Sequence, residues 1–125
     1  MVAADTSSFI AFFEGDPGPD VEALERGLAD QQVCLPPVVL TELLSDSKLP
    51  PRVAGWLKEL PLLATSEGYW ERAGSLRASV LAQRRKARLA DSLITQSCLD
   101  HQLLLIARDR DFRNFARAAG LRVLP

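Results

Sequence analysis

Histidine and cysteine are scarce in this chain of 125 residues, which has one His and two Cys. Cys34 and Cys98 form no CxxC motif and have no histidine at the spacing of a zinc ligand, so the pattern excludes a structural zinc site and a disulfide framework. We expect two buried free thiols instead. His101 lies between a helical segment and an apolar run, and we expect it to be structural.

Long hydrophobic runs, internal repeats and low-complexity tracts are also missing. Hydrophobic residues make up 47% of the chain and charged residues 25%, which excludes a disordered or a membrane-spanning protein. The length suits a single domain over residues 1–125. The first residues, MVAADTSSFIAFFEGD, contain no basic leader, and Asp5 interrupts their apolar run. We therefore expect no signal peptide and a cytoplasmic location.

Charge of each sign is unevenly distributed, although the net charge is only −1. Residues 1–71 contain 12 acidic and 4 basic residues, a net charge of −8, whereas residues 72–125 contain 4 acidic and 11 basic residues, a net charge of +7. Arginine supplies 12 of the 15 cations, and its planar guanidinium group suits phosphate and carboxylate. The split indicates an anionic partner for one face of the protein.

Short apolar runs alternate along the chain with segments whose apolar residues have helical spacing. The expected strands are residues 2–4, 33–35, 62–64, 103–107 and 121–124. The expected helices are residues 9–13, 20–28 with Asp20 as N-cap, 37–44, 53–60, 65–86, 89–99 and 112–119. This alternation predicts an α/β fold, a three-layer α/β/α sandwich with a mostly parallel, roughly five-stranded sheet.

Four acidic residues are expected at one edge of that sheet. Asp5 and Asp109 follow expected strands, and the carboxyl ends of parallel strands share the edge at which ligands bind. Asp91 lies in the first turn of a helix that leads to the start of a strand, which places it at the same edge. Glu42 lies in the apolar segment VVLTELL, and we expect its carboxylate to sit beside the core.

Three of these acids also have a ready structural explanation, whereas the apolar neighbours of Glu42 make such an explanation hardest there. Asp5 can be the N-cap of the helix that follows it, and Asp91 can complement a helix dipole. Asp109 or Asp111 can cap the last helix. Like charges gathered at one edge nevertheless raise one another's pKa unless they are compensated. For carboxylates without His or Cys, the usual compensation is Mg²⁺ or Mn²⁺, and a metal held in this way favours phosphodiester hydrolysis.

A basic segment precedes Asp91 and therefore lies near the acidic edge. Its four cations are Arg84, Arg85, Lys86 and Arg88. They could simply complement the dipole of the preceding helix. Their position also makes them candidates to contact the phosphates of a nucleic acid.

The ordered motifs resemble those of PIN domains, and specifically the VapC-type ribonuclease toxins of bacterial toxin-antitoxin modules. The motifs are Asp5-Thr6-Ser7, Glu42 in VVLTELL, Asp91 in RLADSLIT and Asp109 in IARDRDF. The resemblance implies that these four acids are catalytic and bind Mg²⁺ or Mn²⁺, with support from Thr6 and Ser7. It also implies cleavage of single-stranded RNA regions, a cognate antitoxin protein and a homodimer.

Two points of the resemblance leave alternatives. The family often has a threonine two residues before its fourth acid, where this sequence has Ala107, so Asp111 could share or replace the role of Asp109. The apolar, Trp-bearing segments 53–60 and 70–81 offer helix faces on which a partner helix could lie, and core packing is the alternative for both.

Other families fit less well. A receiver domain needs an Asp after a central strand and a late Lys, but Leu35 and Ala64 end strands here and Lys86 is the last lysine. A haloacid-dehalogenase phosphatase needs Asp-x-Asp, and position 7 is Ser. The remaining alternative is a PIN-like module that binds RNA or protein without cleavage, and the presence of all four acids argues against it.

Overall fold

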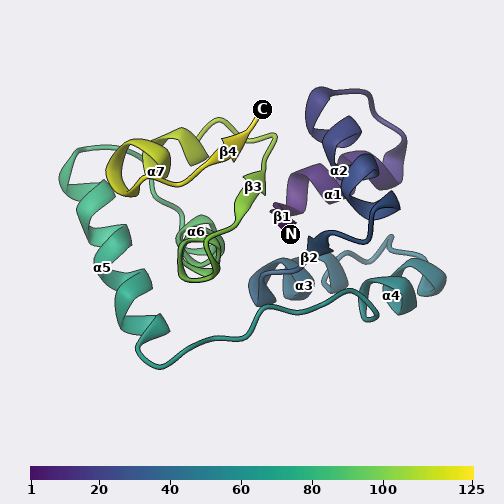
Figure 1. Cartoon of the computed structure of the whole chain (residues 1–125), viewed down its shortest axis with the longest axis horizontal. Helices are drawn as coiled ribbons and strands as arrows, with labels where there is room; N and C mark the ends of the chain where they lie inside the picture. The colour runs from purple at the N-terminus through teal and green to yellow at the C-terminus, as the bar shows by residue number, and fades with distance from the viewer.

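The computed structural model describes all 125 residues, which form seven helices and four strands (Figure 1). The elements in chain order are β1 (Val2–Ala4), α1 (Thr6–Glu14), α2 (Pro19–Ala29), β2 (Val33–Cys34), α3 (Pro37–Leu44), α4 (Pro51–Leu57), α5 (Tyr69–Ala82), α6 (Leu89–His101), β3 (Leu104–Ile106), α7 (Phe112–Ala119) and β4 (Val123–Leu124). This order confirms the alternation of strands and helices that the apolar spacing predicts.

The four strands form one parallel sheet in the order β2-β1-β3-β4. Within it, Ala3 of β1 pairs with Cys34 of β2 on one side and with Leu105 of β3 on the other. The chain passes from β1 toward β2 and from β3 toward β4, so these two connections run to opposite edges of the sheet. Ligands of such sheets bind in the crevice where the strand order reverses, which here lies beyond the carboxyl ends of β1 and β3.

The expected strand at residues 62–64 is reduced to one parallel bridge between Leu62 and Leu35, so the sheet has four strands rather than about five. Leu35 donates its N–H to Pro61 and accepts that of Leu63. Pro36 follows and has no N–H to extend the ladder. Leu62 is also 53% exposed, so little apolar burial favours a longer strand.

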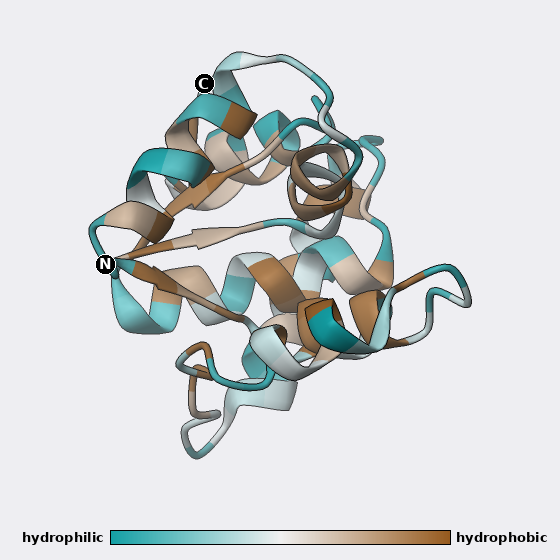
Figure 2. Cartoon of the chain, turned by 90° about the vertical axis from the view of Figure 1, so that its right-hand side faces the viewer, coloured by the Kyte–Doolittle hydropathy of each residue, from teal (hydrophilic) through white to brown (hydrophobic).

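Helices cover both faces of the sheet, as a three-layer sandwich requires. α1 and α2 lie on one side of the strands, and α5, α6 and α7 lie on the other (Figure 1). α3 packs against both α1 and α6. The strands between the layers have hydrophobic colours in Figure 2, and Phe9, Phe112 and Phe115 are among the largest fully buried side chains. The two layers hold the carboxyl edge of the sheet in place.

Four helices, α1, α2, α4 and α5, begin at other residues than expected. α2 starts at Pro19, which suits a first helical position, so Asp20 is its second residue and not its N-cap. α5 covers only Tyr69–Ala82, because Gly68 and Arg84 have φ angles of 80° and 58°, which a right-handed helix cannot contain.

Neither the two thiols nor the imidazole joins acidic side chains in a group that could hold a metal ion. Cys34 and Cys98 are buried free thiols, as predicted. The ring of His101, at the end of α6, lies 2.8 Å from the carbonyl oxygen of Ala64 and ties that segment to the helix. None of the helices combines the length and the apolar character needed to cross a lipid bilayer.

Candidate active site

Asp5 directly follows β1 at the carboxyl edge of the sheet. It is 3% exposed, and it caps α1 by accepting the backbone N–H of Ser8 at 2.9 Å. The Ser7 hydroxyl donates to its other oxygen at 2.9 Å. Burial raises the pKa of Asp5, the hydrogen bonds from Ser8 and Ser7 lower it in part, and the charge of Asp109 raises it. Asp5 is therefore both a helix cap and a member of an acidic group.

Asp91 is the third residue of α6 and is half-buried. Its Oδ2 atom is buried and has no hydrogen-bond partner. Burial, followed by repulsion from Asp109, raises the pKa of Asp91 from 3.8 to about 6, while Arg88 acts in the opposite direction. An unpartnered buried carboxylate oxygen costs free energy, which a bound cation would offset.

Asp109 lies in the connection between β3 and α7. Its Oδ1 atom accepts the backbone N–H of Asp111 at 2.9 Å and so supports the turn into α7. Asp111 occupies the N-cap position of α7, but its side chain makes no capping hydrogen bond. That carboxylate instead lies 3.6 Å from Nζ of Lys86.

The expectation that Glu42 sits beside the core is wrong, because Glu42 is exposed. Val39 and Leu43 turn the buried face of α3 inward, and a helix of 3.6 residues per turn directs the residue before Leu43 to another face. The Glu42 carboxylate has a specific partner all the same. Its Oε1 atom accepts the hydroxyl proton of Thr6 at 2.6 Å, which links α3 to the start of α1 beside Asp5.

The predicted convergence of four acids is only partial. Asp5, Asp91 and Asp109 repel one another from three elements, and Glu42 joins them through Thr6. No three acidic, histidine or cysteine side chains lie close enough together to ligate one ion. The donor set still fits Mg²⁺ or Mn²⁺, because carboxylates are hard donors and Mg²⁺ is commonly held by one or two of them while it keeps several waters. The unpartnered oxygen of Asp91 is one such donor.

The family model for the PIN domain matches residues 2–118. The chain belongs to the PIN domain family. This match confirms the resemblance to PIN domains that the ordered acidic motifs indicate. No curated protein matches the chain.

Several solved structures share the fold of this PIN domain over nearly its whole length. The DNA-bound VapBC from Salmonella typhimurium has a TM-score of 0.73 and 21% identity, covering 98% of this chain and 97% of that chain. VapBC2 from Rickettsia felis, bound to a promoter DNA fragment, has a TM-score of 0.75 and 19% identity, covering 98% and 97%. FitAcB from Neisseria gonorrhoeae has a TM-score of 0.70 and 20% identity, covering 100% and 97%. These likenesses confirm the α/β fold.

The basic segment of this PIN domain lies beside its acids, as its place in the sequence indicates. All four cations are exposed. Lys86 forms the ion pair with Asp111, and Arg88 lowers the pKa of Asp91. Arg84 and Arg85 have no ion-pair partner.

Sequence reasoning missed the ion pair of Asp20 with Arg108 in the PIN domain. Asp20, which is 3% exposed, accepts hydrogen bonds from Nε of Arg108 at 3.0 Å and from the Ser8 hydroxyl at 2.9 Å. Burial raises the pKa of Asp20, but these hydrogen bonds hold it below its ordinary value. The backbone N–H of Ser8 also donates to Asp5, and Arg108 directly precedes Asp109, so the pair braces both strand-end acids. An acid in a first helical turn is common for dipole reasons, so no local signal connects positions 20 and 108.

Proposed function

We propose that this PIN domain is a Mg²⁺- or Mn²⁺-dependent endoribonuclease that hydrolyses phosphodiester bonds in single-stranded RNA regions. One observation carries the proposal: Asp91 has a buried oxygen without a partner, and its pKa is raised to about 6 by burial and by Asp109. Perturbed carboxylates of this kind mark sites at which a ligand supplies the missing charge.

Four acids would hold the ion, some of them through its water ligands: Asp5, Glu42, Asp91 and Asp109. The ion, when bound, lowers the pKa of water and polarises a phosphoryl oxygen, which is the chemistry that phosphodiester hydrolysis needs. Asp111 shares the site through its N–H, which holds the carboxylate of Asp109.

Hydroxyl groups in the first turn of α1 support two of these acids. Ser7 donates to Asp5, and Thr6 donates to Glu42. Both contacts orient carboxylate oxygens at the edge of the sheet before any ligand arrives. Supporting hydrogen bonds of this kind keep a site preorganised, so less reorganisation is needed during the reaction.

The alternative function is binding of RNA or protein without cleavage. It is favoured by the separation of the carboxylates, no three of which lie within reach of one ion. Two features favour cleavage instead: the hydrogen bonds from Ser7 to Asp5 and from Thr6 to Glu42, and the buried, unpartnered oxygen of Asp91. Burying a carboxylate without a partner costs free energy, and binding alone does not require it.

Purified protein, freed of any partner, is expected to cut single-stranded RNA when Mg²⁺ or Mn²⁺ is added and to stop when EDTA removes the metal. Gel analysis of an end-labelled RNA, with a duplex of the same sequence as the control, measures this. Excess Mn²⁺ added after EDTA should restore cleavage. Undiminished cleavage in EDTA would contradict the metal-dependent mechanism.

We further propose that the protein acts in the cytoplasm as the toxin of a toxin-antitoxin pair. The similar structures include VapBC complexes. An apolar cavity of about 560 Å³ offers a seat for a partner helix. Six of its seven lining residues are hydrophobic, and they come from α1, α2 and α4: Phe12, Phe13, Leu28, Ala29, Val53 and Trp56, with Arg52 at its border.

A second copy of the chain is the other proposed protein partner. Trp70 is 64% exposed and Leu81 is 45% exposed, so the outer face of α5 does not pack in the core. These residues lie eleven positions apart, which is close to three helical turns and places them on one face. Large exposed apolar side chains that share a face mark interaction surfaces.

Arg84 and Arg85 are proposed to contact RNA phosphates together with Lys86 and Arg88. Changing Arg84 and Arg85 to Gln should flatten the dependence of RNA affinity on salt by about 1.4 in logarithmic slope, since each contact with a single strand contributes roughly 0.7. Affinities across a salt series, measured with protein whose cleavage is blocked, check this. Arg26→Gln with Lys58→Gln is the matched control, since both residues are exposed elsewhere. If the Arg84→Gln, Arg85→Gln variant shows the same salt dependence as wild type, the two arginines are solvated residues at a helix end and do not contact RNA.

A further inference from the structure

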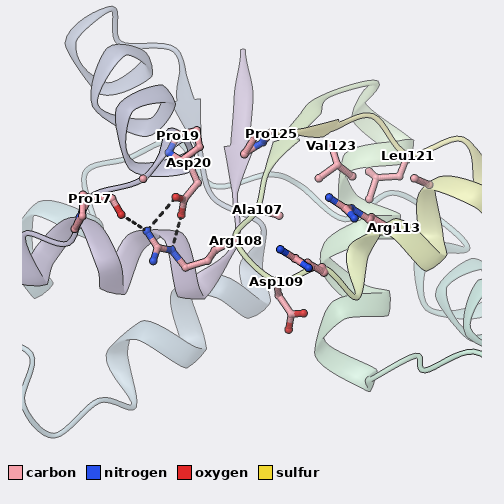
Figure 3. A pocket seen from close by; sticks show the side chains of 13 residues that line it. Pro17, Pro19, Asp20, Ala107, Arg108, Asp109, Arg113, Leu121, Val123 and Pro125 are labelled. Carbon is pink, nitrogen blue, oxygen red and sulfur yellow. Dashed lines mark hydrogen bonds and ion pairs between the residues drawn. The ribbon is translucent and has the colours of Figure 1, made fainter.

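A cavity of about 640 Å³ adjoins the acidic edge, and Asp109 is among the residues that line it (Figure 3). It is lined by the start of α2, by the connection from β3 into α7, and by the end of the chain. Its volume falls in the range of pockets that enclose a small ligand. Nothing in the proposed metal site accounts for it.

The charge on one wall of this cavity is already compensated. Arg108 donates to both oxygens of Asp20, at 3.0 and 3.1 Å, and to the carbonyl oxygen of Pro17 at 2.8 Å. The dashed lines in Figure 3 follow these contacts. This wall is therefore close to neutral and is held by hydrogen bonds.

Two arginines on the opposite wall have no such partner. Arg110 and Arg113 line the cavity, are exposed, and form neither an ion pair nor a side-chain hydrogen bond with the protein. Arg110 lies in the turn that leads into α7 and Arg113 in the first turn of that helix, and the backbone N–H of Arg113 donates to the carbonyl oxygen of Arg110 at 3.0 Å. Figure 3 shows the Arg113 side chain directed toward Ala107 across the cavity. Two free guanidinium groups together favour a phosphate.

The lining also has an apolar part that a free phosphate would leave unused. It consists of Ala107, Ala116, Leu121 and Val123, with Pro125 beside them. A ribose or a base can lie against such a surface while its phosphate reaches the arginines. An acidic peptide would use the arginines but not this surface.

Asp109 connects the cavity to the acidic edge. It lines the cavity, yet Figure 3 shows its carboxylate turned away from Val123 and Pro125. The charge of that carboxylate raises the pKa of Asp91 and the pKa of Asp5, which both belong to the acidic edge. An occupant of the cavity therefore lies next to the acids that are proposed to act on a phosphodiester.

We propose that this cavity binds one nucleotide unit of the RNA strand, next to the phosphate that is cut. Its phosphate contacts Arg110 and Arg113, and its sugar or base lies on the apolar part. The inference rests on the proposed ribonuclease function and names a substrate-binding site for it.

The first test is independent of catalysis. Ribonucleoside 5′-monophosphates are titrated into the metal-free protein in EDTA by calorimetry, with inorganic phosphate and the free nucleosides as separate arms. We expect the monophosphates to bind more tightly than either part alone. Arg110→Gln and Arg113→Gln should each weaken binding by on the order of tenfold, as expected for loss of a charged hydrogen bond. Arg26→Gln with Lys58→Gln should have no effect.

The second test uses cleavage of single-stranded RNA with Mg²⁺. The double variant Arg110→Gln, Arg113→Gln should raise KM more than it lowers kcat. If the wild type cuts RNA but the double variant binds monophosphates and RNA as well as wild type does, the cavity proposal is wrong and the ribonuclease proposal stands. If the wild type does not cut RNA but monophosphate binding depends on both arginines, the ribonuclease proposal is wrong and the cavity's role in binding nucleotides stands. Binding of an acidic peptide that depends on both arginines, with no binding of nucleotides, would overturn the cavity proposal.

Discussion

Replacing Asp91 with asparagine is expected to abolish RNA cleavage while the fold persists. The change removes the charge of a carboxylate whose Oδ2 atom is buried and free of hydrogen bonds. Loss of a residue that merely supports a metal ligand costs roughly 10- to 100-fold in metal affinity or activity, so loss of a ligand should cost at least about a hundredfold. Asp5→Asn should have a comparable effect on the other side of the site.

The matched control for this change is Asp100→Asn on the same helix. Asp100 accepts hydrogen bonds from Arg72 at 2.6 Å and from Gln96 at 2.8 Å, at the opposite end of α6 from Asp91. Cleavage per folded molecule should therefore be retained in that protein. Growth arrest on expression without an antitoxin should follow the same pattern, being lost with Asp91→Asn and kept with Asp100→Asn. Full cleavage by a folded Asp91→Asn protein would rule out its proposed role.

The second large effect concerns stability in the absence of metal. The pKa of Asp91 is raised from 3.8 to about 6 in the folded protein, so the folded state holds a proton that the unfolded state has released between these values. Stability should therefore fall as the pH rises through this range. At neutral pH the penalty is on the order of 2 to 3 kcal/mol. Asp91→Asn removes the ionisable group and with it the penalty.

Denaturant unfolding of both proteins in EDTA, from acid to neutral pH, checks this expectation. The two should be about equally stable below the ordinary pKa of 3.8, and the variant should become more stable than wild type as the pH passes about 6. Mg²⁺ should then stabilise wild type by about 2.7 kcal/mol at a hundred times its dissociation constant, and the variant by less. A metal-free variant less stable than wild type at neutral pH would mean that Asp91 serves the helix dipole instead.

Local patterns in the sequence determined where the elements and three of the acids lie. The apolar runs before Asp5 and Asp109 are short and bounded by polar residues, and each became a parallel strand that leads to the carboxyl edge. Asp91 lies in a first helical turn, as its neighbours' spacing predicts. Gly120 ends the last helix with a φ of 75°, as expected for a residue without a Cβ. These features depend on neighbours within a few positions, which the sequence displays directly.

Features that depend on distant partners were decided by the tertiary structure alone. The rotational phase of α3, set by packing of Val39 and Leu43, exposed Glu42 although its sequence neighbours are apolar. The pair of Asp20 with Arg108 joins segments 88 positions apart. It forms one wall of a cavity that no sequence motif predicts. The raised pKa of Asp91 comes from burial and from charges in two other segments, Asp5 after β1 and Asp109 with Asp111 between β3 and α7. Burial and electrostatic repulsion depend on distances in space, and only packing of the helices on the sheet sets these.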